Sequence, residues 1–109
     1  MSQRDDMALL RDIIETGQTA LREIAGQSFE QITSNSVRLL GLVKCLEIIG
    51  EASSRLSSTF RGSHPDIPWG NIIGMRNRLV HAYFDVDDQQ VWKALTEDLP
   101  ELINQLKEL

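Results

Sequence analysis

The sequence has one cysteine and no long apolar stretch. Its single cysteine, Cys45, excludes an internal disulfide. No apolar run approaches the roughly 20 residues that a membrane-spanning helix needs. The N-terminus is polar and acidic rather than a basic stretch followed by an apolar one. We therefore expect a cytoplasmic protein that does not enter a membrane.

The sequence also has few positively charged residues and lacks the common spacings of His, Cys and Glu that bind metals. The chain has 11 Lys and Arg against 16 Asp and Glu, which gives a net charge of −5. A broad electrostatic grip on nucleic acid needs clustered cations, so binding to nucleic acid has to come from a local patch. There is no Glu-x-x-His pair, no His-x-x-x-His pair and no cysteine cluster. The sequence therefore predicts no metal site and no cofactor.

Helical periodicity is the main pattern that is present. Apolar residues recur at three- and four-residue spacing, and the strict alternation of a strand is nearly absent. The spacing predicts long helices over residues 4–25, 36–59, 69–83 and 89–109, with a short helical turn through 29–32. With 109 residues, these segments make one small domain, residues 1–109. We predict an all-α fold, an antiparallel up-and-down bundle of four main helices and one short helix.

Two residues inside the predicted helices carry structural expectations. Gly17 falls in the apolar stripe of the first helix, where the lack of a side chain permits close contact with another helix. Pro100 lies in the stripe of the last helix and removes one backbone hydrogen bond, which predicts a kink. A bundle of this length has a modest core, which favours a homodimer.

The helix predicted over residues 69–83 carries an unusual set of polar side chains. At about 100° per residue, Arg76 falls at the centre of its apolar arc. Asn77 and His81 lie together at the edge of that arc, and Tyr83 shares a side with Arg76. One interpretation is an anion site with a titratable base, in which arginine binds phosphate and histidine transfers protons. The other is a buried Arg76 that pairs with a carboxylate.

A known family shares these residues. Residues 76–83, RNRLVHAY, fit the pattern Arg-x4-His-x-Tyr. The segments LEIIGEA at 46–52, IPW at 67–69, GMRN at 74–77 and YFDVD at 83–87 stand in the same order as in that family. The ordered set resembles the HepT-like branch of the HEPN superfamily, the toxin half of HepT–MntA type VII toxin–antitoxin pairs.

The resemblance implies a metal-independent endoribonuclease that acts as a homodimer on RNA such as tRNA or mRNA. Arg76 would stabilise charge on the phosphate, and His81 would transfer protons. A two-fold dimer would bring two copies of His81 to one cleft. Asn77 would orient His81 or hold a phosphate oxygen, and Tyr83 would contact the RNA or line the cleft.

Two further residues belong to the expected site in supporting roles. Arg78, two residues after the motif arginine, would add to a local positive patch around the cleft. Glu51 lies in the matching LEIIGEA segment and would also face the cleft.

The resemblance also implies a protein partner, an MntA-like nucleotidyltransferase that acts as the antitoxin. In this family such a partner adds AMP to the motif tyrosine, which is Tyr83 here. The added phosphates would place negative charge beside Arg76 and occupy the RNA site.

Two alternatives remain open at this point. HEPN domains also serve as non-catalytic modules that bind nucleotides or proteins, in which case Arg76 and Asn77 would hold a phosphate and His81 would be structural. The second alternative is a plain helical adaptor in which Arg76 pairs internally with a carboxylate such as Glu51.

Overall fold

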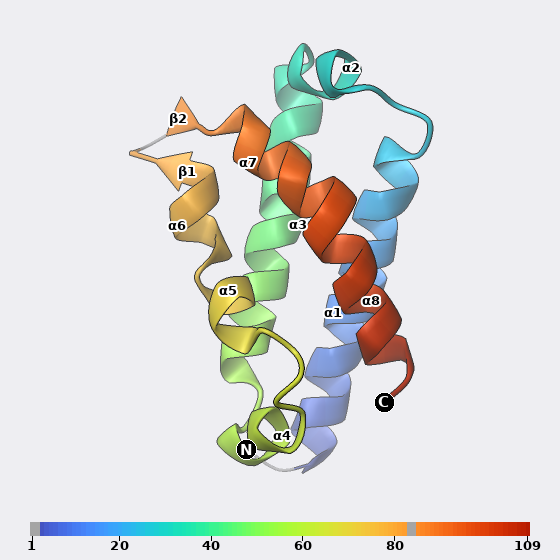
Figure 1. Cartoon of the computed structure of the whole chain (residues 1–109), viewed down its shortest axis with the longest axis vertical. Helices are drawn as coiled ribbons and strands as arrows, with labels where there is room; N and C mark the ends of the chain where they lie inside the picture. The colour runs from blue at the N-terminus through green and yellow to red at the C-terminus, as the bar shows by residue number, and fades with distance from the viewer. Residues whose placement is uncertain (1–2, 83–84) are drawn as a thin grey trace.

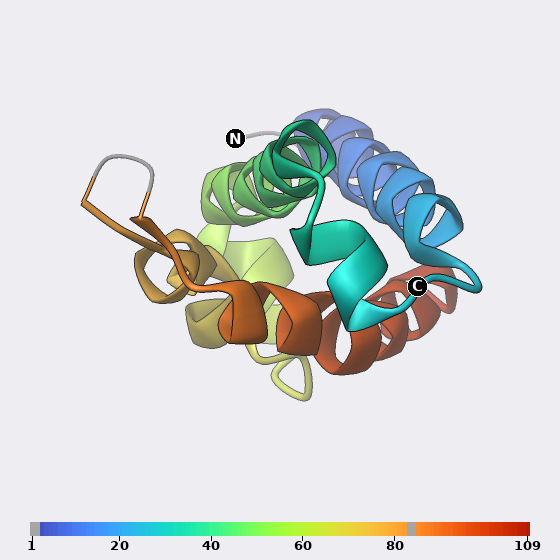
Figure 2. The ribbon, with the colours of Figure 1, turned by 90° about the horizontal axis from the view of Figure 1, so that it is seen from above.

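The computed structural model describes residues 3–82 and 85–109 and arranges them as two layers of helices (Figures 1 and 2). α1 (Gln3–Ile24) and α3 (Ser36–Arg55) lie side by side in one layer. The later helices form the second layer, and the apolar core lies between the two. The molecule measures 41 × 30 × 21 Å. The prediction of an all-α fold is confirmed.

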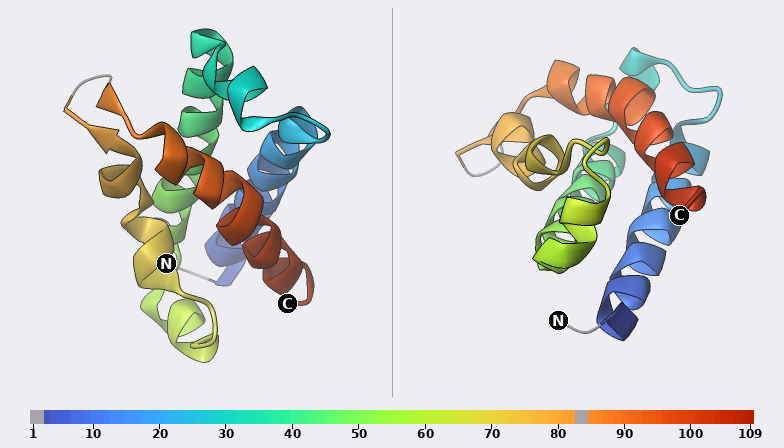
Figure 3. Two further views of the ribbon diagram at one scale, coloured as in Figure 1. Left: turned by 45° about the horizontal axis from the view of Figure 1, so that its top comes forward. Right: turned by 60° about the horizontal axis from the view of Figure 1, so that its bottom comes forward.

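The remaining elements are short. In chain order they are α2 (Phe29–Thr33), α4 (Ser58–Ser63), α5 (Trp69–Ile73), α6 (Met75–Leu79), β1 (Val80–His81), β2 (Asp85–Val86), α7 (Asp88–Lys93), the π-helical turn η1 (Ala94–Asp98) and α8 (Leu99–Lys107). α5 and α6 run along the flank of α3 that faces away from α1 (Figure 3). Among the helices of the described residues, none combines the length and hydropathy that crossing a bilayer requires.

Side-chain caps set the start of the second and third helices. Ser28 and Gln31 form a reciprocal capping box at α2, in which the Gln31 N–H donates to Ser28 Oγ at 3.1 Å. Asn35 caps α3, because its Oδ1 accepts the Arg38 N–H at 3.1 Å. Both caps follow from the Ser and Asn positions in the sequence, and the helix expected from residue 36 begins there.

α3 ends four residues earlier than its apolar pattern predicts. It stops at Arg55, because Ser57 leaves the helix to cap α4 and to bind Asp6 of α1. The buried Asp6 carboxylate accepts the Ser57 hydroxyl at 2.6 Å and the Ser57 N–H at 2.8 Å. These two hydrogen bonds lower the pKa of Asp6. They tie the start of α1 to the turn between α3 and α4.

The helix expected over residues 69–83 is the main correction to the sequence-based fold. Gly74 divides it into α5 and α6, and α6 ends at Leu79. Val80 then takes extended backbone angles, φ −128° and ψ 119°, and β1 pairs antiparallel with β2. Ala82 has a positive φ of 35°, a left-handed turn that no glycine or proline announces in the sequence.

Pro100 is accommodated by a π-helical turn. Proline has no N–H, so the carbonyl four residues earlier, that of Thr96, loses its helical partner. The chain widens into η1 directly before Pro100 and resumes as α8, with Pro100 in the first turn of that helix. The kink expected in the last helix therefore takes the form of a local π turn.

The expectation for Gly17 is confirmed by its neighbours. A Cβ built at Gly17 would lie 2.4 Å from Ile103 Cδ1 and 2.9 Å from Ile103 Cγ1 of α8. The same Cβ would lie 3.3 Å from Leu99 Cδ1. Since Ile103 is 2% exposed, it fills the space that glycine leaves. Glycine at this position therefore sets the spacing between the two layers.

The variant Gly17→Ala is expected to unfold more easily than the wild type. The added methyl group overlaps Ile103, and we expect a net loss of about 1–2 kcal/mol in the free energy of unfolding even after the gain in helix propensity. Chemical denaturation followed by circular dichroism measures the loss. Gly62→Ala is the matched control, because Gly62 is exposed in α4 and its Cβ would meet no described atom within 4 Å. Equal stability of the two variants would contradict this account of the packing.

Candidate functional site

Arg76 and Asn77 stand on α6 where α5 and α6 approach α3. The approach is close because Gly50 has no side chain: a Cβ there would lie 3.0 Å from the carbonyl oxygen of Ile72. A hollow of about 310 Å³ lies beside this contact and is lined by Glu47, Gly50, Glu51, Ser54, Ile73, Arg76 and Asn77. The structure thus brings together three of the predicted site residues.

A second hollow adjoins the first between α1 and α3. Its volume is about 470 Å³, and it shares Glu47, Glu51 and Arg76 with the first. The lining is completed by Leu9, Asp12, Lys44, Ile48, Ala52 and Arg55. Arg76 therefore lies at the junction of two hollows on the surface of α3.

The arginine of the motif is exposed rather than buried. The Arg76 side chain is 61% exposed, and its Nε lies 3.4 Å from Oε2 of Glu47. Of the two interpretations left open by the sequence, the one with a buried Arg76 is therefore wrong. An exposed ion pair of this kind contributes little to stability. Since the guanidinium has five N–H donors, the contact through Nε occupies one of them.

Glu51 is not the partner of Arg76. Its Oε1 lies 3.4 Å from Nε of Arg55, one turn further along α3. The adaptor interpretation paired Arg76 with a carboxylate and gave Glu51 as the example; the carboxylate found beside Arg76 is that of Glu47. Glu51 nevertheless lines both hollows beside Arg76.

His81 lies in β1 and not on the helix that carries Arg76. The expectation that one helix presents Arg76, Asn77 and His81 is therefore wrong, since α6 ends at Leu79. The ladder between β1 and β2 places His81 opposite Asp85. The ends of the two strands project from the helical body (Figure 2). Tyr83, predicted on the same helix, lies outside the described residues.

A carboxylate accompanies the imidazole of His81. Its Nε2 lies 3.4 Å from Oδ2 of Asp87, and the two side chains are 55% and 34% exposed. Asp87 also caps α7, because its Oδ1 accepts the Gln90 N–H at 3.1 Å. This backbone hydrogen bond, followed by the contact with His81, lowers the pKa of the Asp87 carboxyl. Asp87 is thus ionised at neutral pH.

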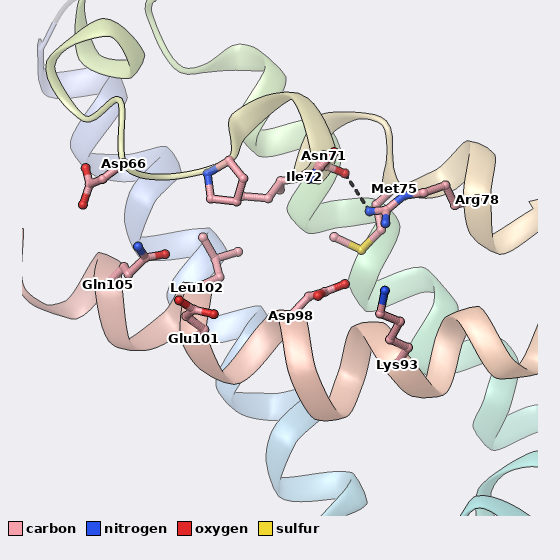
Figure 4. Close-up of a pocket in the computed structure, with 11 residues that line it drawn as sticks. Asp66, Asn71, Ile72, Met75, Arg78, Lys93, Asp98, Glu101, Leu102 and Gln105 are labelled. Atoms are coloured by element: carbon pink, nitrogen blue, oxygen red, sulfur yellow. Dashed lines mark hydrogen bonds between the residues drawn. The ribbon is translucent and has the colours of Figure 1, made fainter.

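Arg78 points to a different part of the surface. It lines a hollow of about 330 Å³ between the α5–α6 pair and the C-terminal helical segment (Figure 4). Its Nη2 donates to the carbonyl oxygen of Asn71 at 2.8 Å. Lys93 and Asp98 face it from the opposite wall (Figure 4). The structure does not place Arg78 in the hollows that Arg76 lines.

Sequence reasoning missed two residues of the site, Glu47 and Asp87. Glu47 lies on the same polar side of α3 as Glu51, and periodicity alone does not say which of them meets Arg76. Asp87 precedes the helix expected from residue 89, where aspartate is a common cap, and its position six residues after His81 gives no sign of a contact between the two side chains. Within residues 3–82 and 85–109, no three His, Cys, Asp or Glu side chains gather as metal ligands would. That the protein uses no metal stays a prediction.

Comparison with known proteins assigns the family. The model of the "Ribonuclease HepT-like" family matches residues 6–109. The chain is 36% identical over 108 residues to "Probable ribonuclease HepT" of Thermococcus cleftensis, an alignment that covers 99% of this chain and 96% of the relative. No solved structure matches the chain.

Two further relatives carry names that assign them provisionally as RNases. One, from Methanocaldococcus jannaschii, is 35% identical over 102 residues and is matched over 94% of both chains. The other, from Caldanaerobacter subterraneus, is 37% identical over 100 residues, which cover 92% of this chain and 89% of the relative. The chain therefore belongs to the HepT-like ribonuclease family. The resemblance seen in the motif and the expectation of a ribonuclease are confirmed at the level of the family.

Proposed function

We propose that this protein is the toxin of a toxin–antitoxin pair and cleaves RNA internally without a metal ion. The observation that carries the proposal is the placement of the two motif residues. Arg76 and His81 both have exposed side chains, and each lies beside a carboxylate, Glu47 and Asp87 respectively. A cation and a titratable ring that are held in place and open to solvent suit an anionic substrate.

The chemistry follows from the structure of RNA. One proton leaves the 2′-hydroxyl, whose oxygen attacks the adjacent phosphorus, and the bond from phosphorus to the 5′-oxygen breaks as that oxygen receives a proton. His81 serves these proton transfers, and Arg76 stabilises the charge that develops on the phosphate. The products are a 2′,3′-cyclic phosphate and a free 5′-hydroxyl.

The neighbouring residues take supporting roles in this proposal. Asn77 lines the same hollow as Arg76 and holds a phosphate oxygen or orients the substrate. Glu51 lies beside it and limits how far the anionic backbone enters. Arg78, in its separate hollow, binds RNA away from the scissile phosphate.

A homodimer would supply two histidines for the two proton transfers, because each chain has one histidine in the motif. Exposed apolar side chains on α3 support such an assembly. Val37 is 81% exposed, Leu40 43% and Ile48 38%. Lys44 and Glu51 alternate in charge along the same exposed side of α3, so two antiparallel copies of this helix can pair opposite charges.

The antitoxin in this proposal is an MntA-like nucleotidyltransferase that adds AMP to Tyr83. The added AMP carries a negative phosphate to Tyr83, two positions after His81. In this proposal that phosphate competes with RNA for Arg76. Tyr83 is the single tyrosine of the chain.

Incubation with ATP and the nucleotidyltransferase should add AMP to Tyr83 and abolish cleavage. Mass spectrometry of the intact chain and of the Tyr83 peptide measures the addition. Tyr83→Phe is the control and should gain no mass. If cleavage is inhibited without any gain in mass, AMP is not added to Tyr83, and the nucleotidyltransferase inhibits by binding alone.

The cleavage itself is tested with purified protein and total tRNA, with and without EDTA. We expect EDTA-resistant cleavage that leaves 2′,3′-cyclic phosphate ends. His81→Ala and Arg76→Ala should each lower the rate about 100-fold or more. His64→Ala is the matched control and should leave the rate unchanged. The His64 ring packs on Phe60, with 4.8 Å between the ring centroids.

Two outcomes would contradict the proposal in different ways. If His81→Ala and Arg76→Ala both retain full cleavage, the site has been assigned wrongly. If the folded, unmodified wild type binds RNA or nucleotides without cutting, the protein is a non-catalytic HEPN binding module.

A further inference from the structure

The backbone holds Asp87 and His81 against each other. In the ladder His81 lies opposite Asp85, and residues two apart on a strand share a face, so Asp87 follows Asp85 on the face of His81. The Asp87 N–H donates to the carbonyl oxygen of Leu79 at 2.7 Å, which continues the pairing past the strand ends. Main-chain hydrogen bonds therefore bring the two residues to one face of the ladder, where His81 Nε2 lies 3.4 Å from Asp87 Oδ2.

The second oxygen of Asp87 is fixed as well. Its Oδ1 caps α7 by accepting the Gln90 N–H, which leaves Oδ2 directed at the imidazole. An ionised carboxylate has no proton to donate and can only accept. A hydrogen bond between the two groups therefore requires that Nε2 of His81 carries the proton.

We propose that Asp87 is a positioning residue that holds His81 in the tautomer protonated at Nε2 and thereby presents Nδ1 to the RNA. The inference rests on the proposed RNA cleavage. Nδ1 of a neutral ring takes the proton of the 2′-hydroxyl, which gives an imidazolium with protons on both nitrogens. In the second copy, an imidazolium releases its Nδ1 proton to the departing 5′-oxygen. Asp87 stabilises the positive ring in both steps.

The chain offers a variant that reverses the tautomer while it keeps the helix cap. In Asp87→Asn the amide oxygen replaces Oδ1 as acceptor for the Gln90 N–H, since asparagine is also a good N-cap. The amide nitrogen then faces His81 and can only donate, so the ring proton is driven to Nδ1. Asp85→Asn is the matched control, because it makes the same change in charge at the residue paired with His81.

The test combines nitrogen-15 NMR of the histidine rings with single-turnover cleavage of RNA. The chain has two histidines, so His81→Ala assigns the signals and His64 serves as an internal reference. At a pH at which both rings are neutral, we expect His81 to be protonated at Nε2 in the wild type and in Asp85→Asn, and at Nδ1 in Asp87→Asn. The single-turnover cleavage rate at saturating protein should fall about 100-fold in Asp87→Asn and little in Asp85→Asn, and the protein concentration that gives half of the maximal rate should stay nearly unchanged.

Each result bears on a distinct statement. The same tautomer in wild type and Asp87→Asn, or a different tautomer with an equal cleavage rate, would overturn the positioning role. If circular dichroism shows that Asp87→Asn does not fold, Asp87→Ser repeats the test. Serine can still cap α7, and its shorter side chain removes the contact with His81. If the wild type does not cleave RNA at all, the proposed function and the positioning role both fail, while the ring signals still decide whether Asp87 contacts His81.

Discussion

The site depends first on how closely α5 can approach α3. Gly50 permits this approach, because its missing Cβ would lie 3.0 Å from the Ile72 carbonyl oxygen and 3.6 Å from that of Ile73. α6 follows α5 directly after Gly74, so the same contact places Arg76 beside Glu47. Any larger side chain at position 50 pushes the α5 backbone outward, and Arg76 moves with it. The packing of one glycine thus fixes the position of the Arg76 guanidinium on the neighbouring helix.

Arg76 and His81 lie beside carboxylates in a chain whose net charge is negative. The net charge of −5 does not favour RNA, and the two groups proposed to act on it each lie beside a carboxylate. These carboxylates orient Arg76 and His81 and also offset part of their positive charge. An arrangement of this kind favours recognition by local contacts over attraction by a long-range electrostatic field.

Periodicity and capping chemistry predicted most of the helices. The starts of α2 and α3 follow from Ser28 and Asn35, and the close contact at Gly17 follows from its place in an apolar stripe. The end of α6 could not be predicted in this way. The residues from 80 to 86 contain no glycine or proline, and the extended backbone is held by pairing between β1 and β2.

The motif residues were found from the sequence, and their neighbours were not. A helical wheel continued through residue 83 places Arg76 and His81 on one rim, whereas the turn after Leu79 moves His81 into β1. The choice between Glu47 and Glu51 as partner of Arg76 depends on where α6 crosses α3, which local spacing does not encode. Contacts of this kind arise from tertiary packing and become visible only in the fold.

Mixing experiments test most directly whether two copies of His81 act in one cleft. Wild type and His81→Ala are combined in varying proportions, allowed to exchange subunits, and assayed for RNA cleavage at constant total protein. If both transfers need a histidine from each copy, the rate falls as the square of the wild-type fraction. A rate that falls in direct proportion to the wild-type fraction would show that each chain acts alone, and it would contradict the paired site.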